Sequence, residues 1–310
     1  MNTNCVVIIV GVIGLASVGV RAASVGRIYW ADSDSQVIQS ANLDGTGLTT
    51  LVSGLSRPHG VAVDRAGGKI YWTDYGTDKV QRADLDGQNV EDLVTTNLAT
   101  PVDIELDAEN GMMYWLDQGP DLIWRANLDG SDAEVVLDVP GAGLQSVSRL
   151  ELDLPRGKMY WTDIEQDTVT RANLDGSELE TIHAVSNVGG LALDSDAGKL
   201  YWADAGATTT ILRANLDGSD VETFISGLSA SASLAFDPVF DRLYWHEGRA
   251  GRMASVSSDG SDELVLFHEV GDRIRTLDVQ AVPTPPAVWL GLAGLAGVVR
   301  KRRGRRTLTS

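Results

Sequence analysis

Acidic residues at a repeated position are the side chains most able to do chemistry in this 310-residue chain. Each stands two residues after the tryptophan of a Tyr-Trp pair: Asp32, Asp74, Asp117, Asp163, Asp204 and Glu247. Such a carboxylate can accept charge-assisted hydrogen bonds from backbone N–H groups, and a ring of such oxygens is able to bind Ca²⁺. Asp32-Ser33-Asp34 resembles part of a calcium loop but lacks the full ligand spacing. The sequence therefore predicts no metal site and no cofactor.

Other residues with catalytic potential are sparse. The four histidines, His59, His183, His246 and His268, are scattered without the His-Glu-x-x-His spacing of a metal site. Cys5 is the single cysteine, and the chain has no Gly-x-Ser-x-Gly nucleophile elbow. We therefore expect a protein that is not an enzyme and has no catalytic residues.

The charge balance disfavours one class of partner. The chain has 43 acidic and 25 basic residues, a net charge of −18, and six of the basic residues lie within 300–306. Binding to nucleic acid depends on Lys and Arg contacts with phosphates, so no nucleic-acid partner is predicted. Because 43% of the residues are hydrophobic and recur periodically, we expect a folded protein.

The acidic residues belong to six copies of one sequence unit. Tyr-Trp pairs recur every 41 to 46 residues, beginning at Tyr29, Tyr71, Tyr114, Tyr160, Tyr201 and Tyr244. A turn follows each tyrosine by 13 or 14 residues, most often as Asn-Leu-Asp-Gly, and Asp-Gly is typical of tight turns between strands. In the second unit the pattern predicts strands at 61–64, 69–74, 79–85 and 90–94. Four strands per unit of this length indicate a propeller blade.

The two ends of the array complement each other. The first copy begins at Arg27 without the apolar strand that precedes the other Tyr-Trp pairs, and a strand of that kind stands alone at 275–280. Pairing of these N- and C-terminal strands would close the ring and remove exposed sheet edges. We therefore predict an all-β, six-bladed β-propeller over residues 27–280.

The repeated residues match a known family. Tyr-Trp-Thr-Asp stands at 71–74 and 160–163, and with the Leu-Asp-Gly turns it resembles the YWTD, or LDL-receptor class B, repeat. The resemblance implies a six-bladed propeller, a fold whose members in this family mainly bind proteins and peptides outside the cell.

Residues that every blade carries are interpreted as structural, because large rings packed between blades bury much area. Arg82, Arg125, Arg171 and Arg213, which precede the turns, are predicted to pair with some of the repeated acids. The structural set is Tyr29, Trp30, Asp32, Tyr71, Trp72, Asp74, Tyr114, Trp115, Asp117, Tyr160, Trp161, Asp163, Tyr201, Trp202, Asp204, Tyr244, Trp245 and Glu247.

Ligand contacts are predicted among residues that differ between copies, on the loops that share one rim of the ring. These are the loops entering each innermost strand and the loops joining the second and third strands. The candidates are Asp34, His59, Tyr75, Asp78, Asp121, Glu165, Asp167 and His246. This acid-rich rim suggests a platform for a basic segment of another protein; the simpler alternative is a solvated surface.

Both termini resemble addressing segments. Residues 1–23 contain an apolar run at 5–15 followed by small residues, which is typical of a signal peptide; a membrane anchor is the alternative. Residues 281–310 combine a proline motif, an apolar run able to form a short membrane helix, and a basic tail. This layout resembles the PEP-CTERM sorting signals of bacterial envelope proteins, which implies an exosortase-type processing enzyme as a partner.

We therefore expect an exported, non-catalytic propeller that binds a protein or peptide at a bacterial cell envelope, cell surface or extracellular matrix. One alternative is an envelope hydrolase or lyase, similar to six-bladed lactonases with a divalent cation at the propeller axis. The other alternative is a structural matrix component.

Overall fold

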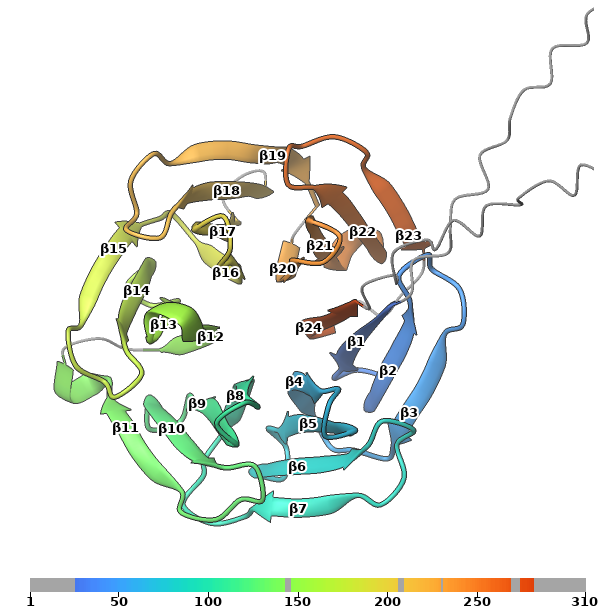
Figure 1. The fold of residues 1–310 in the computed structure, drawn as a ribbon, viewed down its shortest axis with the longest axis vertical. Coiled ribbons are helices and arrows are strands. Elements are labelled where there is room, and N and C mark those ends of the chain that lie inside the picture. The colour runs from blue at the N-terminus through green and yellow to red at the C-terminus, as the bar shows by residue number, and fades with distance from the viewer. Residues whose placement is uncertain (1–25, 143–145, 206–208, 230, 269–273, 282–310) are drawn as a thin grey trace, which may run out of the picture.

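The computed structural model describes residues 26–142, 146–205, 209–229, 231–268 and 274–281. They form six four-stranded antiparallel sheets arranged as blades around a central axis (Figure 1). This confirms the predicted all-β, six-bladed propeller. The predicted signal peptide, and the predicted sorting signal apart from Ala281, lie outside the described residues. Among the residues described, no helix is both long enough and apolar enough to cross a membrane.

Each blade has an innermost, a second, a third and an outermost strand, counted outward from the axis (Figure 1). The innermost strands are β4 (Pro58–Asp64), β8 (Pro101–Asp107), β12 (Val147–Asp153), β16 (Val188–Asp194), β20 (Ser231–Asp237) and β24 (Ile274–Ala281). The second strands carry the Tyr-Trp pairs and are β1 (Gly26–Asp32), β5 (Lys69–Asp74), β9 (Met112–Asp117), β13 (Lys158–Asp163), β17 (Lys199–Asp204) and β21 (Arg242–Glu247).

The outer half of each blade follows the same order. The third strands are β2 (Val37–Asn42), β6 (Lys79–Asp84), β10 (Leu122–Asn127), β14 (Thr168–Asn173), β18 (Thr209–Asn215) and β22 (Arg252–Ser257). The outermost strands are β3 (Thr49–Ser53), β7 (Glu91–Val94), β11 (Glu134–Asp138), β15 (Glu180–Ala184), β19 (Glu222–Leu228) and β23 (Leu264–His268). Short 3₁₀ turns lie in some of the described connections: η1 (Pro140–Ala142), η2 (Leu154–Arg156) and η3 (Gly248–Ala250).

The first blade is assembled from both ends of the described chain. β24 pairs antiparallel with β1, with Arg27 opposite Gln280, Tyr29 opposite Asp278 and Asp32 opposite Ile274. This confirms the predicted closure. Since β1 is thereby paired on both sides, the ring has no open seam between its first and last strands.

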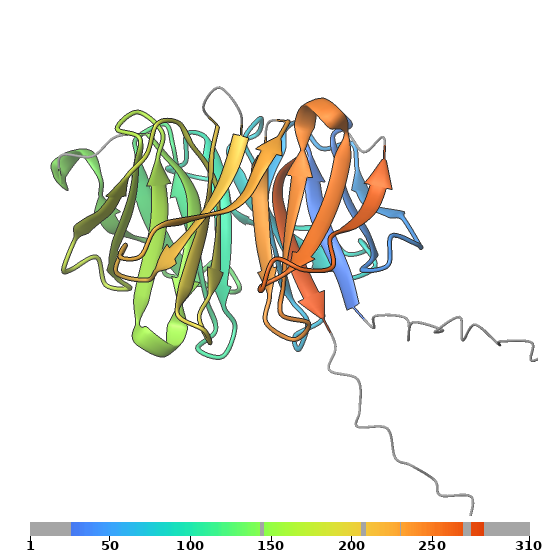
Figure 2. The same cartoon turned by 90° about the horizontal axis from the view of Figure 1, so that it is seen from above.

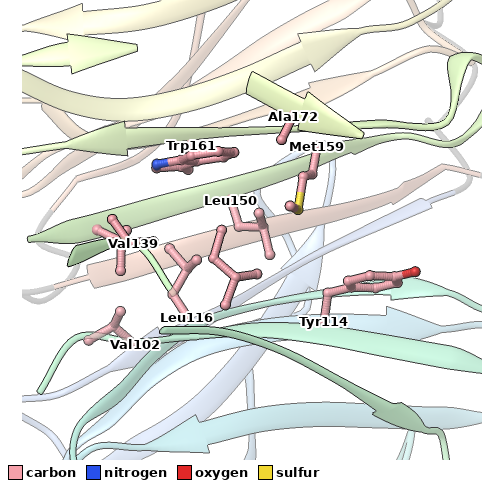
Figure 3. Close-up of a cluster of buried hydrophobic side chains, with 10 residues drawn as sticks. Val102, Tyr114, Leu116, Val139, Leu150, Met159, Trp161 and Ala172 are labelled. Carbon is pink, nitrogen blue, oxygen red and sulfur yellow. The ribbon is translucent and has the colours of Figure 1, made fainter. Parts of the chain in front are cut away.

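Packing between blades provides the core. The six tryptophans of the repeated pairs are fully buried, each at 0% exposure. In the cluster between the third and fourth blades, Trp161 and Met159 of β13 face Leu116 and Tyr114 of β9 (Figure 3). Second strands such as β5 are buried on both faces because a neighbouring blade covers each side, so their sequences read as nearly continuous apolar runs rather than as a strict alternation.

Arginines of the third strands connect neighbouring blades. Arg82 forms an ion pair with Glu91 of β7 at 2.7 Å and donates to the Leu128 carbonyl of the next blade at 2.9 Å. Arg171 and Arg213 repeat this arrangement, and Arg125 pairs with Glu134. The prediction that these arginines pair with the repeated acids is therefore wrong.

The repeated acids bind backbone N–H groups instead. Asp74 accepts hydrogen bonds from the N–H groups of Ser56 and Arg57, both at 2.9 Å, and so fastens the loop that enters β4. Asp32, Asp117, Asp163 and Glu247 also accept backbone N–H groups. A buried carboxylate satisfied in this way orders the loop beside it.

Glycines of the Leu-Asp-Gly turns meet the preceding blade. Gly130 has a φ of +83°, and a Cβ atom there would lie 2.5 Å from the Leu93 carbonyl oxygen. Gly45, Gly87, Gly176 and Gly218 have equally close neighbours in the preceding blades. The turn glycine is therefore required both by its backbone conformation and by the approach of two blades.

Replacing Gly130 with alanine should destabilise the propeller more than replacing Gly111. Both glycines have positive φ, but a Cβ at Gly111 would meet no atom within 4 Å. Backbone strain of roughly 1 kcal/mol applies to both variants, and Gly130→Ala should lose about 2 kcal/mol more through the clash between blades. Urea unfolding of the two variants measures this difference; equal losses would show that the contact between blades is unimportant.

Candidate functional site

The candidate rim lies at one end of the propeller. The register places the first residue of each innermost strand opposite the last residue of a second strand, as with Pro58 and Asp74. Loops entering the innermost strands therefore lie beside those joining the second and third strands. The start of β1 and the end of β24 lie at the opposite end of the ring (Figure 2).

Two predicted rim acids have structural roles. Asp121 and Asp167 lie in left-handed turns, with φ of 55° and 53°. Their carboxylates accept the N–H groups of Val147 and Val188, both at 3.3 Å, at the first residue of the next blade's innermost strand. Burial raises the pKa of Asp121, and the nearby Asp163 and Glu165 carboxylates raise it further.

Three other predicted acids, Asp34, Asp78 and Glu165, are exposed on the rim loops. They lie on three different blades, between β1 and β2, β5 and β6, and β13 and β14. Negative charge is therefore spread over the rim rather than gathered at one point.

The ring of Tyr75 contacts two other side chains of the rim, Arg57 and His59. This half-buried ring lies beneath the Arg57 guanidinium, 4.7 Å from the ring centroid. His59 stacks on it with centroids 6.5 Å apart, and the His59 Nδ1–H donates to the Val102 carbonyl at 2.5 Å. Burial lowers the pKa of His59 well below its usual value, and Arg149 and Arg275 lower it further. His59 is therefore a neutral support for Tyr75.

His246 is fully buried in β21. It cannot touch a ligand on the rim surface, so its prediction as an exposed rim residue is wrong. It follows a tryptophan in a strand that is covered on both faces, and such a position does not belong to a loop.

Several charged side chains around the axis were not predicted from the sequence. Asp103 of β8 accepts the Leu150 N–H at 2.9 Å, and Asp278 of β24 accepts the Val63 N–H at 2.7 Å. Glu105 and Glu151 border the same axial space. The sequence did mark Glu105, Glu151 and Asp278 as unusual, because the equivalent residues of β4, β16 and β20 are the alanines Ala62, Ala192 and Ala235.

The axial carboxyls bind protons more tightly than exposed ones. Burial raises the pKa of Asp103 and of Asp278 to about 6. Burial also raises the pKa values of Glu105 and Glu151 well above normal, and repulsion from neighbouring acids adds to this. On the rim side of the axis, burial lowers the pKa of Arg149, which the charge of Asp103 partly offsets.

The acids of the site that the structure describes do not form a metal centre. Within the described residues, no group of three or more His, Cys, Asp or Glu side chains is arranged so that it could hold a metal ion.

Sequence comparisons identify the repeats. Residues 26–65, 68–107 and 157–194 match the family described as Low-density lipoprotein receptor repeat class B, so the chain carries these repeats. The vitellogenin receptor of Solenopsis invicta is 31% identical over 82 residues. That match covers 26% of this chain but 5% of the receptor, so this chain corresponds to a small part of that curated relative.

Structural comparisons show the fold. A chain in the crystal structure of a nidogen/laminin complex superposes with a TM-score of 0.73 and 22% identity, covering 84% of this chain and 100% of that one. TolB from Acinetobacter baumannii gives a TM-score of 0.66 and 16% identity, covering 82% and 66% of the two chains.

Removing axial acids should change how stability depends on pH. A carboxyl whose pKa is raised by folding contributes stability below its unfolded pKa of about 4, and this contribution is lost as pH rises through the folded pKa. Wild type should therefore lose stability relative to Glu105→Gln/Glu151→Gln as pH rises from about 4 through the raised folded pKa values, by about 1.4 kcal/mol for each unit of pKa elevation.

Urea unfolding of both proteins across this pH range measures the difference. Exposed acids elsewhere are common to the two proteins and cancel in the comparison. Parallel stability curves would show that these two glutamates have ordinary pKa values.

Proposed function

We propose that this chain is an exported, non-catalytic propeller that binds a protein or peptide with a basic segment through its rim. The class B repeats support a binding role, since the curated relative that carries such a segment is a receptor. One matched structure is a complex of nidogen with laminin, which supports a protein ligand and a place outside the cell. Both likenesses are analogies, because one covers few residues and the other has low identity.

The observation that carries the proposal is that some rim acids are hydrogen-bonded to the backbone whereas others are exposed. Asp121 and Asp167 are engaged by backbone N–H groups of the next blade. Asp78 and Glu165 are exposed on loops that rigid blades hold in place. Fixed, exposed carboxylates on separate blades can attract several basic side chains of one extended ligand, which favours capture and orientation of a positively charged partner.

The rim also offers surface for apolar contact. Ile164, next to Glu165, is 43% exposed, and the half-buried ring of Tyr75 lies on the second blade. Rings held by their neighbours lose little side-chain entropy on binding, which favours affinity. A ligand that alternates basic and apolar residues would match both features.

The cellular setting rests on the sequence of the termini. We propose that residues 1–23 direct export and that residues 281–310 act as a sorting signal read by an exosortase-type enzyme in a bacterial envelope. The apolar run and basic tail support this assignment. A propeller placed there would meet its ligand at the cell surface or in the extracellular matrix.

Neutralising the exposed rim acids should weaken binding of a basic peptide. The probe is a fluorescent decalysine peptide at physiological salt, with affinity measured by anisotropy. Asp78→Asn/Glu165→Gln removes two exposed charges and should lower the affinity about fivefold, since each exposed pair contributes roughly 0.5 kcal/mol.

The matched control removes two exposed charges from the opposite end of the ring. Glu109 and Asp196 lie in the turns after β8 and β16, and both are exposed. Glu109→Gln/Asp196→Asn should change the affinity less than twofold. Equal losses in both variants would mean that the peptide senses net charge alone, and an unchanged rim variant would contradict the proposal.

A further inference from the structure

A cavity lies on the axis at the end of the ring opposite the rim. It has a volume of about 290 Å³, and the turn after β20 and the last residues of β24 form its mouth. Apolar side chains, Leu277 and Val279 among them, form part of its wall. A single water occupies roughly 30 Å³ of liquid, so the space suits a small organic group.

Carboxylates dominate the polar lining. Glu105, Glu151 and Asp278 line the cavity, and each is the fifth residue of an innermost strand. Asp237 lines the cavity near its mouth. Of the described residues that line this cavity, none is basic. Negative charge in a partly enclosed space is costly unless a cation accompanies it.

Two buried polar atoms in this region make no hydrogen bond. Oδ2 of Asp237 is one, although Oδ1 of the same carboxylate accepts the Val239 N–H at 2.8 Å. Ser233, at 1% exposure, is the other, since its Oγ has no partner within the described structure. Ser233 does not line this cavity; it lines a separate, smaller space that Asp103, Arg149, Glu105 and Glu151 also border. Buried polar atoms of folded proteins are normally paired, so the Asp237 oxygen left without a donor at this cavity indicates that a donor-rich group is missing.

We propose that this axial cavity binds an organic cation, with its ammonium or guanidinium group between Glu105 and Glu151 and its alkyl part against Leu277 and Val279. An ammonium supplies three donors and a guanidinium five, and neither accepts a hydrogen bond. These donors match the carboxylate oxygens of the lining, including the unpartnered Oδ2 of Asp237. The alkyl chain would fill the apolar part of the wall.

Proton release should accompany binding. Burial and mutual repulsion raise the pKa values of Glu105 and Glu151, so a cation that stabilises their ionised forms displaces protons. Asp278 lines the same cavity and adds negative charge. Asp103 and Arg149 line the smaller space that Glu105 and Glu151 also border, and Arg242 acts on Asp237 at the mouth. Affinity should therefore rise with pH.

Titration calorimetry of the full chain with agmatine, which carries both an ammonium and a guanidinium group, tests this inference. We expect one site per chain, with affinity at least tenfold weaker in Glu105→Gln/Glu151→Gln and unchanged in Glu109→Gln/Asp196→Asn. Asp237→Asn, which leaves Glu105 and Glu151 in place, should weaken binding several-fold. Thermal unfolding of each variant verifies that it is folded.

Three outcomes would overturn the proposal. They are an unchanged affinity in Glu105→Gln/Glu151→Gln, equal binding of the neutral analogue 1-butanol, and tight binding of Ca²⁺ that agmatine does not displace. Because this site and the rim are at opposite ends of the ring, loss of decalysine binding in the rim variant has no bearing on it. Failure with agmatine would equally leave the rim proposal intact.

Discussion

The propeller depends on the burial of large aromatic rings between neighbouring sheets, because one sheet alone would leave these rings exposed to water. Each blade has four strands, and its second strand is covered on both sides. A Trp at 0% exposure contributes to stability only while the next blade is in place, and the loss of such a ring costs about 3–5 kcal/mol. The blades are therefore mutually dependent, and the closed ring is the smallest arrangement of this chain in which every one of them is covered.

Most of this architecture could be predicted from the sequence because the constraint repeats. Tyr-Trp pairs at regular intervals and Asp-Gly turns identified the strands of each blade, and the isolated strand at 275–280 identified the closure. The ends of β4 and β7 differ from the predicted strands by a few residues, since β4 extends back to Pro58 and β7 begins at Glu91. Boundaries of this kind depend on tertiary pairing, which local patterns do not encode.

The site was harder to predict because an aspartate at the same position of two equivalent loops can be hydrogen-bonded in one loop and exposed in the other. Asp78 and Asp121 occupy the same left-handed turn position, yet only Asp121 is seen to fasten a neighbouring strand. His246 looked like a loop residue and is buried, while Glu105 looked like part of an apolar strand and borders a cavity. Spacing indicates which residues recur, but the neighbours across the ring decide whether a carboxylate is engaged or available.

The pairing of β24 with β1 also governs how the molecule is built in time. During translation the strand at 26–32 emerges first, and its partner at 274–281 emerges only after the whole ring has been synthesised. A contact across such a separation in sequence forms slowly, because the entropy of closing a long loop opposes it. The nascent protein must therefore pass through an open, incomplete arc of blades, and only its last strand converts that arc into a locked ring.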